Sequence, residues 1–140
     1  MNGLHAIQLG APTNIFPIAV LTNSYSGAVS SAVDLESYDG LALTLKVTTA
    51  QAKTCNLKFQ WSHDDSAYFD ELVEVQGSAA AGEQPYTILS RVIQIDMTST
   101  GNLYIARLRR MARYFRVTMK SDATTTGQVR VDTIKLLNGN

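Results

Sequence analysis

The sequence predicts an all-β protein, an antiparallel two-sheet β-sandwich of jelly-roll type with eight to nine short strands. Three observations carry this prediction. Apolar and polar residues alternate with the period of two of a half-buried strand, polar turns recur at intervals of roughly 8–12 residues, and no stretch shows the helical period. A chain of 140 residues can bury a core as one domain, residues 1–140.

The clearest strand covers residues 41–47, where three leucines and a valine fall on one face. The following strand places Leu57, Phe59 and Trp61 on a second inward face, and together with a return strand it makes a hairpin whose two arms Trp61 and Phe69 could anchor. The segments that fit a strand, of which the first and third are the weakest, cover residues 4–9, 15–21, 29–35, 41–47, 55–62, 68–75, 87–96, 103–106, 114–120 and 128–137.

Two of these strands carry a local irregularity. Pro17 has no N–H to donate, so the segment 15–21 is expected at a sheet edge or with a bulge at its start. In the last strand the apolar parity changes between Val131 and Ile134, so a one-residue bulge is expected near residues 132–133.

Residues 103–120 hold five of the seven arginines, and we expect them on or beside a corner, residues 107–112, that joins two strands. Arginine is enriched at protein interfaces because its planar fork grips carboxylates at two points. Tyrosine is also favoured there, and Tyr104 and Tyr114 are expected on the outer faces of the same two strands. The cluster therefore predicts an interaction surface, although a solvated rim balancing the acidic hairpin is the plainer interpretation. The arginines are Arg107, Arg109, Arg110, Arg113 and Arg116.

The apolar run 15–21 is a second candidate contact, provided that the core does not cover it. Its contact residues would be Ile15, Phe16 and Ile18. Seven residues with a proline inside are too short to cross a bilayer, so no membrane association is expected.

The charges divide along the chain. Residues 1–83 hold nine acids and three bases, a balance of −6, and residues 84–140 hold three acids and nine bases, a balance of +6. The net charge of zero argues against a general nucleic-acid binder, so phosphate contacts are the lesser interpretation of the arginines. The split can be satisfied within one fold, or it can pair copies of the protein with one another or with another surface.

No catalytic constellation appears, so we expect neither an enzyme nor a cofactor. Cys55 is the only cysteine, and His5 and His63 are the only histidines. A metal site made of His63 and nearby aspartates is conceivable, but adjacent polar residues in a hairpin turn are more often simply solvated. The N-terminus lacks the basic region of a secretory signal.

Two pieces resemble landmarks of discoidin or galactose-binding-like domains. The run FQWSHDDSAYF at residues 59–69 resembles their hairpin of apolar strand, Ser-x-Asp turn and aromatic residue. The run ARYFRV at residues 112–117 resembles their A-R-Y-x-R-x strand. In those families these residues mainly hold the fold, so the resemblance implies a jelly roll and brings no sugar site with it.

Over its full length the chain resembles the small jelly-roll cement (decoration) proteins of tailed bacteriophages, and is similar in length and layout to that of a Bordetella podophage. The resemblance implies a non-enzymatic virion protein that binds the outside of the major capsid protein shell and stabilises it, commonly as a homodimer. Synthesis in the host cytoplasm and a place on the capsid exterior follow from the same resemblance.

Two other functions fit the same pattern. One is a carbohydrate-binding or receptor-binding module of a phage tail or fibre, which would need exposed aromatic rings along a cleft near Tyr68 or Tyr86. The other is a neck or tail connector subunit, which would form a ring rather than a dimer.

Overall fold

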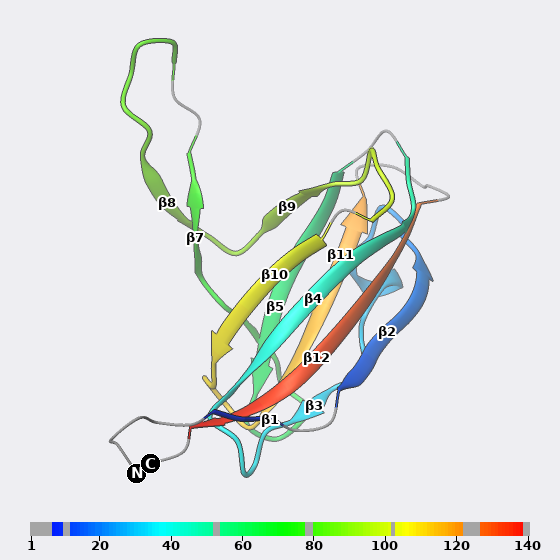
Figure 1. The fold of residues 1–140 in the computed structure, drawn as a ribbon, viewed down its shortest axis with the longest axis vertical. Coiled ribbons are helices and arrows are strands. Elements are labelled where there is room, and N and C mark those ends of the chain that lie inside the picture. The colour runs from blue at the N-terminus through cyan, green and yellow to red at the C-terminus, as the bar shows by residue number, and fades with distance from the viewer. Residues whose placement is uncertain are drawn as a thin grey trace.

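The computed structural model describes residues 7–9, 12–51, 54–77, 80–101, 103–121 and 127–138. Two antiparallel sheets face each other across one apolar core, and a two-stranded arm extends beyond the sandwich (Figure 1). The all-β antiparallel sandwich predicted from the sequence is confirmed. The described residues form twelve strands, more than the eight to nine expected, because the two weakest expected segments both form short strands and two other expected strands are each divided in two.

The first sheet, sheet A, has β12 and β4 at its centre. Strand β12 pairs with β4 on one side and with β1 and β2 on the other, and β4 pairs with the edge strand β10. The bounds are Ile7–Leu9 for β1, Thr13–Val20 for β2, Gly40–Thr49 for β4, Leu103–Arg109 for β10 and Gln128–Asn138 for β12.

The second sheet, sheet B, is built on the long pair β5 and β11. Strand β11 also pairs with β3, and β5 pairs with both β6 and β9. A short 3-10 helix, η1 (Tyr25–Gly27), lies against β11. The bounds are Val33–Asp34 for β3, Thr54–Ser62 for β5, Phe69–Asp70 for β6, Ile93–Asp96 for β9 and Tyr114–Ser121 for β11.

The core between the sheets is apolar, and sheet B contributes an aromatic cluster to it. The three leucines and the valine of β4 that the alternation placed inward are all fully buried. From sheet B, Trp61 and Phe59 pack on Phe115, with ring centroids 4.9 and 5.8 Å from that of Phe115. Burying one of these large apolar side chains contributes roughly 1.5–3 kcal/mol before entropy is counted, so the inner faces of the two sheets contribute most to the stability of the fold.

Strand β2 lies at an edge of sheet A, as Pro17 required. Among the strands that the structure describes it pairs only with β12, and the register between them shifts on both sides of Val131. The bulge expected near residues 132–133 therefore lies just before them, and it affects β2 alone. Toward β4, β12 keeps an unbroken register from Val129 to Leu136.

The change of parity in β12 has a different cause from the one predicted. Because the register with β4 is continuous, Ile134 and Leu136 lie on the outer face of sheet A, opposite to the buried Val131. Leu136 is nevertheless only 7% exposed, and it borders a cleft on that face together with Tyr38. Its burial on the outer face, and not a bulge toward the core, explains the sequence pattern.

The expected strands 68–75 and 87–96 are each interrupted. Strand β6 pairs with β5 at residues 60–61 and β9 pairs with it at residues 54–57, so both use the same edge of β5. The chain between them leaves the sheet and returns. It forms the arm, in which β7 (Val73–Gln76) pairs with β8 (Thr87–Ser90).

Burial makes the lone thiol inert. The Cys55 side chain lies in the core, and burial raises its pKa to about 12. Since the thiolate is the reactive species, we expect the native protein to resist iodoacetamide at mildly alkaline pH and the denatured protein to gain one carbamidomethyl group, as measured by intact mass. Equal alkylation rates for native and denatured protein would contradict the buried position.

Candidate functional site

The arginine-rich segment crosses from one sheet to the other. Strand β10 ends at Arg109 in sheet A, and β11 begins at Tyr114 in sheet B. The corner between them is thus residues 110–113, shorter than the expected 107–112. A second crossing, from β3 to β4, runs beside it, because the Leu35 N–H donates to the Arg113 carbonyl at 2.7 Å.

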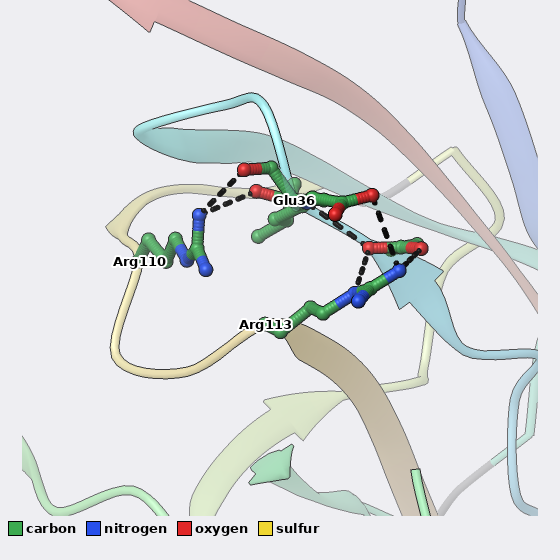
Figure 2. Close-up of polar contacts among 5 residues, drawn as sticks. Glu36, Arg110 and Arg113 are labelled. Atoms are coloured by element: carbon green, nitrogen blue, oxygen red, sulfur yellow. Dashed lines mark hydrogen bonds and ion pairs between the residues drawn. The ribbon is translucent and has the colours of Figure 1, made fainter. Parts of the chain in front are cut away.

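Arg113 joins the two crossings through its side chain. Its Nε and Nη2 donate to the two carboxylate oxygens of Asp34 at 2.9 Å each, and Nη2 also reaches Glu36 at 3.2 Å (Figure 2). This two-point contact fixes both the position and the plane of the guanidinium. It also holds the pKa of Asp34 below its usual value, with the hydrogen bonds from Arg113 as the main cause.

Arg110 holds the same turn through carbonyl groups. Its Nη1 donates to the carbonyl oxygens of Leu35 at 2.8 Å and Glu36 at 3.0 Å (Figure 2). Its main-chain N–H donates to the Asp39 carbonyl at 2.8 Å. Arg110 therefore stabilises the fold at this corner, a role that differs both from the predicted interaction surface and from the solvated rim considered as the alternative.

Arg116 is also engaged inside the molecule, on the outer face of sheet B. Its Nε donates to Gln60 at 2.9 Å, and its guanidinium carbon lies 3.7 Å from the centroid of the Tyr68 ring. Tyr68 in turn hydrogen-bonds to Asp65. The stacked arginine covers a face of Tyr68, so this ring does not present the open platform that a carbohydrate site near Tyr68 would require.

Arg107 and Arg109 differ from the other three. Both are exposed, and within the described part of the chain neither guanidinium has a hydrogen-bond or ion-pair partner. They line a cleft of about 600 Å³ at the end of sheet A, together with Tyr38 and Leu136. Among the predicted arginines, they are the two whose side chains have no partner in the described residues and remain available to another protein.

The two tyrosines of the predicted surface separate. Tyr114 is half-buried, and the Arg113 guanidinium lies 5.0 Å from its ring centroid. Tyr104 was expected on the outer face and instead packs against the core, because β10 turns Tyr104, Ala106 and Leu108 inward. The outer face of β10 holds the alternate residues, which include Ile105 at 68% exposure.

The candidate apolar contact near the N-terminus belongs to the core. Ile15 is 2% exposed and Phe16 is 6% exposed, so the condition set for a surface contact is not met at these two positions. The register shifts in the β2–β12 pair allow neighbouring residues to be buried together. The Ile18 side chain lies outside the described part of the structure.

The arm is a functional candidate that sequence reasoning missed. It exposes Tyr86, Ile88 and Leu89 by 48%, 45% and 65%, and within the part of the chain that the structure describes its strands pair only with each other. Gly77 allows the two strands of the arm to approach each other, since a Cβ at this position would lie 2.1 Å from the Tyr86 ring. The consecutive apolar pair Ile88–Leu89 could have indicated the exposed arm. Adjacent residues of a strand point to opposite faces, so one of the two must be exposed when the protein covers only one face.

At the base of the arm lies a half-buried carboxylate. Glu71 accepts a hydrogen bond from the Trp61 indole N–H at 3.2 Å, and burial raises the pKa of Glu71. Burial and the nearby charge of Glu71 also raise the pKa of Tyr104. This group links the first residues of the arm to the aromatic core.

The histidine turn has an internal structure of its own. Asp64 accepts hydrogen bonds from the N–H groups of Ser66 and Ala67 and from the Ser62 hydroxyl, which lower its pKa. The His63 ring lies 6.0 Å from that of Phe69. Among the residues with described placement, no three His, Cys, Asp or Glu side chains are grouped as metal ligands would be. No helix in the same set is long and apolar enough to span a bilayer.

Comparison with known proteins assigns no family. No family model matches the chain, and no curated protein sequence matches it. Among solved structures, the crystal structure of the SPBc2 prophage-derived protein YomS aligns over 97% of both chains, with 13% identity and a TM-score of 0.49. The function therefore has to be argued from the surfaces of the molecule itself.

Removing the acceptor of Arg113 tests the structural role of the corner. Asp34 has a lowered pKa, so its ion pair stabilises the fold above the ordinary value of 3.8, and this stability is lost as the pH falls below that value. We expect Asp34→Asn to lower the melting temperature by a few degrees at neutral pH. The difference from the wild type should shrink in acid.

The control is Arg91→Gln, which removes an exposed charge that lies outside the corner and has no described partner. It should leave the melting temperature unchanged at both pH values. If the melting temperature of Asp34→Asn equals that of the wild type at neutral pH, the contact between Arg113 and Asp34 does not stabilise the fold at this corner.

Glu71 has the opposite pH signature. The folded-state pKa of Glu71 is raised above the ordinary value of 4.5. The free energy of unfolding therefore decreases as the pH rises from that ordinary value through the folded-state pKa. Glu71→Gln keeps an oxygen for Trp61 and removes the desolvated charge, so its melting temperature should exceed that of the wild type at neutral pH and match it near pH 4, below the ordinary value of 4.5. A gain that is the same at both pH values would argue against desolvation as its cause.

Proposed function

We propose that this chain is a non-enzymatic structural protein of a tailed phage, a cement (decoration) protein that binds the outside of the major capsid protein shell and stabilises it as a homodimer. The observation that carries this proposal is the arm. It leaves the sandwich and exposes apolar side chains that a solitary domain has no reason to leave in water. The resemblance of the whole chain to jelly-roll cement proteins supports the same conclusion.

The arm is poorly supported within one copy. Its two strands pair only with each other among the described residues, and an isolated two-stranded hairpin is at best marginally stable in water. Fully burying an exposed apolar side chain contributes roughly 1.5–3 kcal/mol, and covering Tyr86, Ile88 and Leu89 on a protein surface would contribute about half of that for each, because each is already partly covered. An arm of this kind is suited to association with another protein.

The second surface is cationic. Arg107 and Arg109 are exposed on β10 beside Ile105, and Met111 follows at the corner with 53% exposure. Charged groups around apolar side chains give a contact both orientation and specificity. A protein with two separate contact surfaces can bridge neighbours in a lattice, and a dimer can gain affinity by engaging two shell subunits at once.

Stabilisation of the shell would follow from mass action. A protein that binds only the assembled lattice adds to its stability about 2.7 kcal/mol per site when its free concentration is 100 times the dissociation constant. No chemical step is needed for this effect.

The direct test mixes the purified protein with empty shells assembled from the major capsid protein of the same phage. We expect saturable co-sedimentation and a higher temperature of shell disassembly, compared with the same shells without the added protein. Binding should weaken as salt is raised, since the arginines are exposed. Failure to co-sediment at moderate salt would contradict the proposed function.

A further inference from the structure

The arm has one face directed toward its own sandwich and one directed away. Val73 and Val75 pack against the core, and Ile88 lies opposite Val75 on the same face. On the other face, Glu74 lies directly opposite Leu89. Leu89 is 65% exposed, so this second face combines an apolar side chain with a carboxylate and has no partner within the described chain.

The edge strand β10 offers the matching combination. It pairs with β4 on one side only, so its other edge is open among the described residues. Its outer face presents Ile105, then Arg107 and Arg109 along the same side. Ile105 and Leu89 are the two most exposed large apolar side chains of the described structure, at 68% and 65%.

The charges of the two surfaces are opposite. The sequence from residue 71 to residue 90 contains three glutamates and no lysine, arginine or histidine. Of these glutamates, Glu71 is half-buried at the base, whereas Glu74 and Glu83 are exposed. The basic partner of such an arm is found in the same sequence, on β10, so the charge complementarity points to a second copy of this chain.

We infer that the arm of one copy docks on the outer face of β10 in a second copy, where Leu89 packs on Ile105 and Glu74 pairs with Arg107. This inference rests on the self-association included in the proposed function and names its surfaces. Directly opposed residues in a strand pair lie about 5 Å apart, and alternate residues along one strand lie about 7 Å apart. The long, flexible side chain of Arg107 can bridge the difference of about 2 Å between these two spacings, so the Leu89–Ile105 and Glu74–Arg107 contacts can form together.

Reciprocal exchange of the two arms closes the assembly. If the arm of each copy lies on β10 of the other, both contacts are related by a two-fold axis and no surface is left to extend a chain. The arm extends past the end of the sandwich (Figure 1), so its outer part is accessible to an approaching copy. The open edge of β10 also allows a strand of the partner's arm to add to sheet A.

Charge reversal on each side provides the test. Glu74→Arg places an arginine of the arm against Arg107 of the other copy, and Arg107→Glu places a glutamate of the edge against Glu74 of the other copy. Each variant alone repels its own copies, so the dissociation constant of its homodimer should rise by about tenfold or more. In a mixture of the two, both arms meet an edge of opposite charge, so a heterodimer should form with wild-type affinity.

Sedimentation equilibrium and native mass spectrometry would measure these states without any capsid. Lys120→Glu is the matched control, because it makes the same charge change on sheet B, in the strand β11. It should dimerise as the wild type does. Circular dichroism of each variant would show that the strands are retained.

Restored dimerisation in the mixture alone would support the pairing of Glu74 with Arg107. A wild-type protein that stays monomeric up to its solubility limit would overturn the inference, and so would single variants that dimerise normally or a mixture that does not recover. Because shells are absent, these results are separate from the capsid-binding test. A dimer formed through other surfaces would leave the proposed function standing.

Discussion

The fold depends on holding two crossings between its sheets side by side. In one crossing the chain passes from sheet B to sheet A between β3 and β4. In the other, later in the sequence, it passes from sheet A to sheet B between β10 and β11. Main-chain hydrogen bonds join the crossings at both ends, and the guanidinium groups of Arg110 and Arg113 bind carbonyl and carboxylate oxygens of the first crossing. These contacts tie the two sheets together at one corner of the sandwich, and the rings of Trp61 and Phe115 pack between the strands that follow.

The cationic side chains fall into two groups: those on sheet B that have partners within the molecule, and those on sheet A that have no described partner. On sheet B, Arg116 lies over Tyr68, and the ammonium of Lys58 lies 4.2 Å from the centroid of the Tyr25 ring. Such contacts attach the loops of this face to the sheet, so its positive charge is used within the molecule. On sheet A, the edge strand β10 keeps Arg107 and Arg109 without described partners beside an exposed isoleucine. The surface available for association is therefore narrower than the arginine content suggests.

The sequence was informative wherever alternation decides the structure. The inward faces of β4, β5 and β11 were predicted residue by residue, and Pro17 correctly placed β2 at an edge. Tyr104 was misplaced because β10 is a strand whose two faces both carry apolar residues, so its phase is set by the packing of the other sheet. The arm was missed because strands 68–75 and 87–96 fit the alternation, and only competition for one edge of β5 forces each to divide.

Hydrogen exchange measured by mass spectrometry tests the central claim that the arm is a contact element supported by a partner. In dilute solution the amides of β7 and β8 should exchange quickly while those of β4 and β11 stay protected, because isolated hairpins open readily. When copies or shells bind, protection should appear in the arm and at β10. An arm that is as protected as β4 in the monomer, or that stays unprotected in every assembly, would contradict the account.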